Sequence, residues 1–136
     1  MQFMESNIWL ILIALVSGIM LLWSMLGNRL KGVKEADCAA ALQLINHKDA
    51  CVLDVREADE FSSGHLLNAK HIPLSKLRER IGELERCRDK PVVVVCRSGQ
   101  RSATACMLLG REQFTQVYNL AGGVLAWQKA NLPLEK

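Results

Sequence analysis

The sequence predicts an α/β domain, an open parallel sheet with helices on both faces, preceded by one N-terminal transmembrane helix. Three observations lead to this fold class. Short β-branched stretches alternate with helical stretches after residue 34, which is typical of parallel sheets. Residues 92–95 are four consecutive valines, and a strand without a polar face is buried on both sides. Residues 8–26 are almost wholly apolar, as a membrane span requires.

The apolar N-terminal segment has the length of a membrane-spanning helix. As a helix it would extend roughly 28 Å, close to the hydrocarbon thickness of a bilayer. Trp9 and Trp23 lie near its two ends, where interfacial aromatic residues are common. A signal peptide fits less well, because no basic region precedes the segment and no small-residue cleavage site follows it. A buried core helix is also disfavoured, since the segment has no polar face.

The charges beside this segment predict its orientation. Arg29, Lys31 and Lys34 follow it, whereas Glu5 is the charged residue that precedes it. Basic residues favour the cytoplasmic side of a membrane. We therefore expect a single-pass protein, most simply of a bacterial inner membrane, with the N-terminus outside and the C-terminal domain in the cytoplasm.

The chain accordingly divides into four segments. Residues 1–7 are expected outside the cytoplasm, and residues 8–26 in the membrane. Residues 27–34 form a juxtamembrane linker that is too short to let the domain move far from the bilayer. Residues 35–136 are long enough for one compact α/β domain.

The elements of the domain follow from its periodicity and turn residues. Helices are predicted at residues 35–46, 57–63, 74–86, 102–113 and 123–130. Strands are predicted at residues 51–55, 69–72, 92–95 and 116–120. Acidic residues favour the start of the first helix, and Leu77, Ile81 and Leu84 repeat at helical spacing in the third. Pro73 ends the strand before it.

The cysteine content favours a reducing compartment. Five cysteines are an odd number, and they lack the spacing of a disulfide framework, so we expect reduced thiols. Cys51 on a strand, and Cys38 and Cys106 on apolar helix faces, are interpreted as packing residues. Cys87 lies in a charged stretch and is interpreted as an ordinary surface thiol, with resolution of a persulfide as the alternative.

The strongest functional signal directly follows the valine run. Cys96 ends that strand, a polar loop containing Gly99 comes next, and a helix begins near Ser102. Open α/β sheets bind ligands beyond the carboxyl ends of their strands, where loop N–H groups and a helix N-terminus converge on anions. Such surroundings lower the pKa of a thiol. The sequence therefore predicts a reactive thiolate that acts on a small anionic substrate, with a purely packing cysteine as the alternative.

The loop from Cys96 to Arg101 resembles the active loop of the rhodanese (sulfurtransferase) family, which has the same length. Cysteine phosphatases of similar fold use one residue more, which disfavours a phosphatase or arsenate reductase. The resemblance extends over roughly residues 35–135, in family order. It includes residues 54–57, 60–61, 64–65, 69, 72–74, 120–123, 126–127 and 132–133. Asn68 and His71 depart from the family pattern, but asparagine tolerates a positive φ.

The resemblance implies a reaction in two half-reactions. Cys96 would attack the outer sulfur of a small anionic donor such as thiosulfate, release sulfite and carry a persulfide. A thiol, a protein acceptor or cyanide would then take that sulfur. The loop residues expected to bind the substrate, mainly through their amides, are Arg97, Ser98, Gly99, Gln100, Arg101 and Ser102.

Charged residues at this sheet edge have separate expected roles. Arg97 is expected to bind the donor's sulfonate, and Arg101 to shape the loop unless it is only a solvated helix-start residue. Asp54 and Arg56 follow a strand and are expected to organise their loop. Arg56 either reaches the active loop or pairs with Glu60, and the structural role is favoured.

Other classes of partner are not indicated. The histidines His47, His65 and His71 show no ligand spacing with the cysteines, so neither a metal nor another cofactor is expected. His65 is interpreted as structural. A net charge of +3 does not indicate a nucleic-acid partner.

A competing function remains, in which the protein is a membrane adaptor that docks membrane or cytoplasmic proteins through its domain or its anchor.

Overall fold

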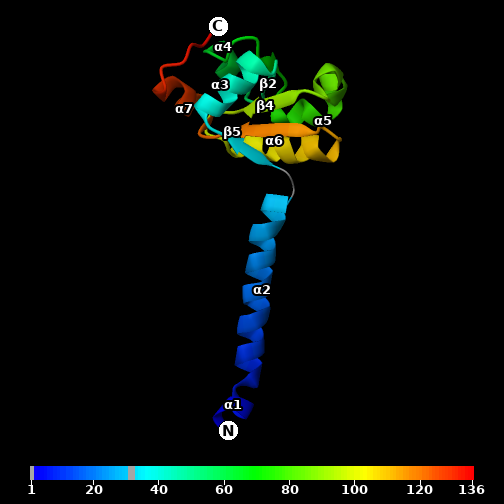
Figure 1. The fold of residues 1–136 in the computed structure, drawn as a ribbon, viewed down its shortest axis with the longest axis vertical. Helices are drawn as coiled ribbons and strands as arrows, with labels where there is room; N and C mark the ends of the chain where they lie inside the picture. Colours follow the sequence, from blue (N-terminus) through cyan, green and yellow to red (C-terminus); the bar gives the residue numbers. More distant parts are fainter. Residues whose placement is uncertain (1, 31–32) are drawn as a thin grey trace. The chain divides into compact units, whose positions relative to one another are not determined.

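The fold was obtained as a computed structural model, which describes residues 2–30 and 33–136 (Figure 1). The chain separates into two compact units, with the boundary between Lys31 and Gly32. Part of the predicted linker, residues 31–32, lies outside the described residues. The two units are therefore considered one at a time.

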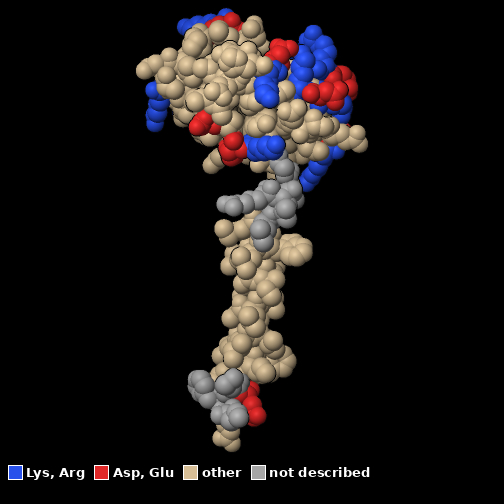
Figure 2. Space-filling view, viewed as in Figure 1, with Lys and Arg blue, Asp and Glu red and all other residues tan. Residues whose placement is uncertain are grey.

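The N-terminal unit consists of the short helix α1 (Gln2–Ser6) and the long helix α2 (Ile8–Leu30). The window Ile8–Met25 has a mean hydropathy of 2.4, and none of it is buried within the protein. Figure 2 shows only uncharged side chains along the described part of this stretch on the face in view. The helix is thus long and apolar enough to cross a membrane, and it continues past residue 26, the predicted end of the span.

The C-terminal unit is built on a sheet of five parallel strands, which confirms the predicted fold class. The spatial order of the strands is β1-β5-β4-β2-β3. Their bounds are β1 Lys34–Ala36, β2 Cys51–Asp54, β3 Lys70–His71, β4 Pro91–Val95 and β5 Gln116–Leu120. The central strand β4 is buried along its whole length, as the valine run predicted.

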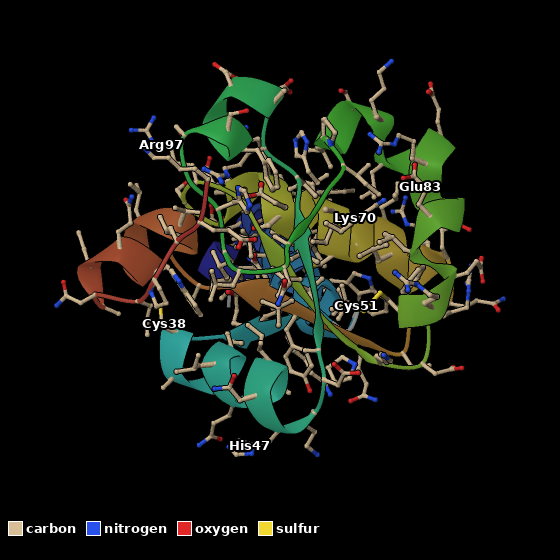
Figure 3. All side chains as sticks on the ribbon, turned by 90° about the horizontal axis from the view of Figure 1, so that it is seen from above. Cys38, His47, Cys51, Lys70, Glu83 and Arg97 are labelled. Carbon is tan, nitrogen blue, oxygen red and sulfur yellow. A yellow bond between two sulfur atoms is a disulfide. The ribbon has the colours of Figure 1, made fainter. Side chains whose placement is uncertain are left out.

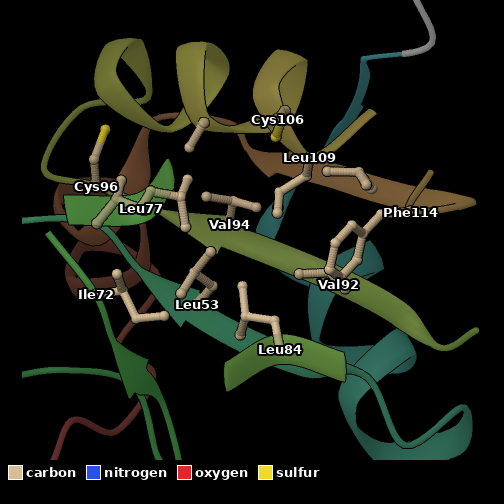
Figure 4. Close-up of a cluster of buried hydrophobic side chains, with 13 residues drawn as sticks. Leu53, Ile72, Leu77, Leu84, Val92, Val94, Cys96, Cys106, Leu109 and Phe114 are labelled. Carbon is tan, nitrogen blue, oxygen red and sulfur yellow. The ribbon is translucent and has the colours of Figure 1, made fainter. Parts of the chain in front are cut away.

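The valines of β4 divide between two apolar clusters. Val92 and Val94 pack in the cluster that faces α6 (Gln100–Arg111), together with residues such as Leu53 and Leu109 (Figure 4). Val93 and Val95 pack in the cluster on the other face, which includes residues of α3 (Cys38–His47) and α7 (Gly123–Lys129). Burying each such side chain stabilises the fold by about 1.5–3 kcal/mol. Helices therefore cover both faces of the sheet.

The first strand replaces the start of a predicted helix. Residues 34–36 pair with β5, and Ala36 is buried in that position. Helix α3 begins only at Cys38, where Asp37 caps it by accepting a hydrogen bond from the N–H of Ala40 at 2.8 Å. The prediction of a helix from residue 35 was wrong, because strand pairing overrides the helix propensity of so short a segment.

The predicted helix at residues 74–86 is divided into three short pieces. They are the 3-10 turn η1 (Leu74–Lys76), helix α5 (Leu77–Arg80) and the 3-10 segment η2 (Ile81–Cys87). Gly82 lies in the third piece, and glycine weakens a helix interior. Leu77 and Leu84 are nevertheless buried in the α6-facing cluster, as their spacing predicted.

A disulfide joins Cys51 and Cys87, whose Cα atoms are 6.0 Å apart. The expectation of five reduced thiols was therefore wrong, and so was the interpretation of Cys87 as a surface thiol; Cys51 packs against the α6-facing cluster, as expected, but as half of a disulfide. The two cysteines are 36 residues apart, and their pairing depends on the fold, which brings the start of β2 beside the end of η2. Their spacing in the sequence therefore did not reveal the pair. Since disulfides persist in oxidising compartments, the cysteines no longer support a cytoplasmic domain.

Candidate active site around Cys96

The loop at Cys96 connects β4 directly to α6. Cys96 follows Val95 and is almost completely buried, with 1% of its surface exposed. Gly99 precedes the first helical residue and has φ +105°, a conformation that glycine adopts without strain. The strand end, the glycine turn and the helix start thus fix a tight loop in which backbone N–H groups face inward.

The backbone of the loop is packed closely against Gly123. A Cβ atom at that position would lie 2.3 Å from the carbonyl oxygen of Cys96 and 2.5 Å from that of Arg97. The N–H of Val124 also donates to the carbonyl oxygen of Cys96 at 2.9 Å. Gly123, the first residue of α7, therefore lets the last helix pack against the backbone of the active loop.

Two polar groups contact the sulfur of Cys96 directly. The N–H of Gly99 donates to Sγ at 3.0 Å, and the hydroxyl of Ser102 lies 3.2 Å from Sγ. Burial by itself would raise the pKa of the Cys96 thiol. The Ser102 hydroxyl and the N–H groups of Ser102, Gly99 and Ser98 stabilise the thiolate more strongly, so the pKa is lowered from its ordinary value.

The surroundings of the other free cysteines, Cys38 and Cys106, disfavour a thiolate. Burial raises the pKa of Cys106 to about 12, with smaller contributions from the charges of Glu35 and Cys96. Burial and the neighbouring Asp37 raise the pKa of Cys38. Cys96 is thus the free cysteine whose surroundings favour a thiolate among those that the structure describes.

A buried amide supports the loop from behind. Asn119 of β5 accepts a hydrogen bond from the Ser102 hydroxyl at 2.5 Å through Oδ1. Its Nδ2 donates to the carbonyl oxygen of Gly99 at 3.0 Å and to Glu35 Oε1 at 3.1 Å. Neither Asn119 nor Glu35 was among the predicted site residues. The last strand also contains Gln116 and Tyr118, so its sequence did not single out Asn119, which is the polar residue buried there.

Arg101 is bound to a carboxylate of helix α4. Its guanidinium donates to both carboxylate oxygens of Glu60, at 2.8 and 2.9 Å. Glu60 also closes a capping box at the start of α4 (Ala58–Ser62), where it accepts from the N–H of Glu57 at 3.2 Å. The hydrogen bonds from Arg101, opposed by partial burial, lower the pKa of Glu60 to about 2. Arg101 thus ties the active loop to α4.

Asp54 and Arg56 form a buried ion pair at the end of β2. Arg56 Nη2 lies 2.7 Å from Asp54 Oδ2 and also donates to the carbonyl oxygen of Gly64 at 2.7 Å. Asp54 additionally accepts from the N–H of Arg56 at 3.0 Å. Arg56 therefore pairs with neither of the expected partners, since Glu60 is taken by Arg101. The pair organises the loop after β2.

Aromatic stacking holds α4 in place. Phe61 stacks on His65 and His71, with ring centroids 3.8 and 4.5 Å apart. His65 Nδ1 hydrogen-bonds the carbonyl oxygen of Phe61, and His71 Nε2 that of Arg56. Asn68 has φ +61°, so this departure from the family pattern fits its backbone. Within the described residues, no group of His, Cys, Asp or Glu has the arrangement of a metal site.

A pocket opens beside the active loop. It has a volume of about 230 Å³, and its lining residues are Arg56, Glu60, Ser63, Gly64, Arg97, Val124, Leu125 and Gln128. Arg97 is exposed and makes no side-chain hydrogen bond or ion pair within the described residues. Figure 3 shows it at the edge of the domain, on the side away from Cys51. The strand register agrees, because Cys51 pairs with Val92 at the opposite end of β4 from Cys96.

This geometry defines a class of α/β proteins in which a buried cysteine, with its thiolate favoured, lies in an amide-lined loop before a helix. Residues 37–130 match the family described as Rhodanese-like domain. The chain therefore belongs to the rhodanese family, and the predicted resemblance is confirmed.

Similar proteins share the domain. The chain is 39% identical over 103 residues to the Escherichia coli protein YibN, a match that covers 75% of this chain and 72% of YibN. It is 34% identical over 99 residues to a Vibrio cholerae protein named thiosulfate sulfurtransferase GlpE, covering 73% of this chain and 92% of the relative. The solved structure of a rhodanese-related protein from Thermoplasma volcanium matches with a TM-score of 0.68 and 34% identity. That match covers 75% of this chain and 97% of the solved chain.

Proposed function

We propose that the protein is a membrane-anchored sulfurtransferase that transfers a sulfane sulfur atom through a persulfide on Cys96. The observation that carries the proposal is the contrast among the free cysteines. Cys96 faces an N–H group and a hydroxyl that lower its pKa, whereas the pKa of Cys38 and of Cys106 is raised. The named sulfurtransferase among the relatives supports the same chemistry.

In the first half-reaction the Cys96 thiolate attacks the outer sulfur of a donor such as thiosulfate. A bond forms between Sγ and that sulfur, and the sulfur–sulfur bond of the donor breaks. The bonding electron pair leaves with sulfite. Arg97, the exposed cation beside the pocket, binds the sulfonate group of the donor.

In the second half-reaction a thiolate or cyanide attacks the outer sulfur of the persulfide. The Cys96 thiolate is the leaving group, and the acceptor becomes a persulfide or thiocyanate. The N–H of Gly99 and the Ser102 hydroxyl stabilise the negative charge that returns to Sγ. The same groups thus serve both halves of the cycle.

The engagement of Arg101 disfavours phosphate chemistry. Both carboxylate oxygens of Glu60 accept from its guanidinium, so the arginine is turned to α4. The loop from Cys96 to Arg101 is also shorter than a phosphatase loop. We expect negligible hydrolysis of aryl phosphates, and we expect a glycine inserted after Gly99 to impair sulfur transfer.

Mass spectrometry of the full-length protein in mild detergent tests the proposal. Incubation with thiosulfate should add one sulfur atom to the peptide that contains Cys96. Cys96→Ser should abolish the addition, whereas the matched control Cys38→Ser should retain it. Persulfide formation at the parental rate in Cys96→Ser would refute the assignment.

The charge asymmetry of the anchor supports an orientation. Arg29, Lys31 and Lys34 follow the apolar helix, and Glu5 precedes it. We propose that the helix spans a membrane with the N-terminus outside and the sulfurtransferase domain in the cytoplasm. The Cys51–Cys87 disulfide would there form only under oxidising conditions.

A further inference from the structure

We propose that Asn119 is the positioning residue of the active loop and that Glu35 sets the orientation of its side-chain amide. Asn119 does not touch the reacting sulfur. It binds two residues that do, Ser102 through its hydroxyl and Gly99 through its carbonyl group. The inference rests on the proposed function, because it assigns a role in the chemistry of Cys96.

The strand register places Asn119 between the edge strand and the active loop. Its sheet neighbours are Glu35 on β1 and Val94 on β4, one residue before the end of that strand. The residue is 3% exposed, so its polar atoms need partners inside the protein. All of its side-chain hydrogen bonds run toward the loop or toward Glu35.

Asn119 restrains Gly99 through its carbonyl group, which belongs to the peptide that follows the one carrying the Gly99 N–H. Nδ2 donates to the carbonyl oxygen of Gly99 at 3.0 Å, while the N–H of the same residue donates to Cys96 Sγ at 3.0 Å. Gly99 has φ +105° and no side chain with which to fix itself. The Gly99 carbonyl also accepts from the N–H of Ala103 at 3.3 Å, so Asn119 and the first turn of α6 together restrain the residue whose N–H contacts the sulfur.

Asn119 also determines what the Ser102 hydroxyl can do. A hydroxyl carries one proton, and two neighbours of this one can accept it, Asn119 Oδ1 at 2.5 Å and Cys96 Sγ at 3.2 Å. When the sulfur bears a proton, the hydroxyl donates to Oδ1 and accepts from the thiol. When the sulfur is a thiolate, the hydroxyl can turn its proton to Sγ. A buried hydroxyl is thus hydrogen-bonded in both states.

Glu35, together with the carbonyl of Gly99, fixes which end of the amide faces Ser102. Nδ2 of Asn119 lies between two oxygen acceptors, the carbonyl of Gly99 and Glu35 Oε1. A flipped amide would put Oδ1 against both of them, with no proton between the atoms. The carboxylate of Glu35 is on an exposed residue, so water competes for it and its contribution is smaller than that of Asn119.

The decisive variant is Asn119→Asp in the full-length protein in mild detergent. Aspartate has the same shape and, when ionised, accepts from Ser102 but cannot donate to Gly99 or Glu35. We expect the pKa of Cys96, measured from the pH dependence of its alkylation by iodoacetamide, to rise. We expect kcat/KM with thiosulfate and cyanide to fall between about tenfold and a hundredfold. Asn131→Asp, an exposed asparagine after α7, is the matched control.

A folded Asn119→Asp variant with parental pKa and parental kcat/KM would overturn the proposal. It would leave the proposed function intact, since that function depends on loss of the persulfide in Cys96→Ser. If the Asn119 variants do not fold, Glu35→Ala decides instead. It should shift the pKa of Cys96 in the same direction by a smaller amount, and Glu35→Gln, which keeps an oxygen acceptor, should recover most of the shift. An unchanged pKa in Glu35→Ala would then refute the inference.

Discussion

Arg101 and Glu60 form a bidentate ion pair between the active loop and helix α4. Arg101 Nη1 lies 2.8 Å from Glu60 Oε1, and Nη2 lies 2.9 Å from Oε2. The residues are 41 positions apart in the sequence. The pair is partly exposed, at 36% for Arg101 and 27% for Glu60, so water screens it. Its main effect is therefore on the geometry of the loop rather than on global stability.

Replacement of Glu60 by glutamine tests whether the ion pair affects the loop more than global stability. We expect the free energy of unfolding to fall by less than about 1 kcal/mol, because exposed pairs contribute little. The rate of persulfide formation should fall more clearly than stability, since the loop loses its anchor on α4. Urea denaturation and the rate of mass gain with thiosulfate measure the two quantities. A large loss of stability without a change in rate would contradict the prediction.

The Arg101–Glu60 pair should also make the stability of the fold depend on pH. The pKa of Glu60 is lowered in the folded protein to about 2, from an ordinary value of 4.5. A carboxylate with a lowered pKa adds stability above its unfolded pKa and loses it as the pH falls through the folded one. The stability difference between the parent protein and Glu60→Gln should therefore be complete above pH 4.5 and vanish toward pH 2. A difference that is constant over this range would show that the ion pair contributes nothing.

Gly123 should not tolerate a side chain. Its φ is +60°, and a Cβ atom would collide with the carbonyl oxygens of Cys96 and Arg97. We expect Gly123→Ala to destabilise the protein by more than about 1 kcal/mol and to displace the active loop. Gly82→Ala is the matched control, because no atom lies within 4 Å of the added Cβ. Equal thermal stability of the two variants would contradict the close packing of the loop on α7.

The Cys51–Cys87 disulfide should affect stability but not sulfur transfer. It closes a loop with a sequence separation of 36, and its loss should cost about 2–4 kcal/mol. It lies at the opposite end of β4 from Cys96, so the double variant Cys51→Ala/Cys87→Ala should form the persulfide at the parental rate. Thermal unfolding and mass spectrometry measure both effects. Slower persulfide formation in the folded double variant would indicate coupling between the two ends of the sheet.

The orientation of the anchor can be measured in cells. The protein should remain in the membrane fraction after carbonate washing. Protease added to intact spheroplasts should spare the domain, and protease added to inverted vesicles should digest it, because Arg29, Lys31 and Lys34 favour the cytoplasmic side. Digestion of the domain from the outside face would show the opposite orientation. It would also agree with an oxidising compartment around Cys51 and Cys87.

The sheet and the loop could be predicted from local sequence patterns. The run at residues 92–95 has no polar face and consists of β-branched residues, which favours a short strand buried on both sides. Cys96 and Gly99 follow it within a few residues, and this short distance along the chain made the position of the loop predictable. Strand β1 was missed, because three residues carry no periodic pattern and their pairing with β5 depends on the folded sheet.

Contacts between distant segments could not be predicted. The Cys51–Cys87 disulfide and the Arg101–Glu60 pair join residues 36 and 41 positions apart. The bond from Asn119 to Glu35 spans 84 positions. Each depends on which elements become neighbours, and sequence patterns report local structure and burial rather than spatial partners.

The most direct test of the account uses thiosulfate labelled either in its outer sulfur or in its sulfonate sulfur. In a single turnover the outer label should appear on the peptide that contains Cys96 and pass to added cyanide as thiocyanate. The sulfonate label should be released as sulfite. Outer label that never resides on Cys96, or sulfonate label bound there, would contradict a persulfide mechanism at this residue.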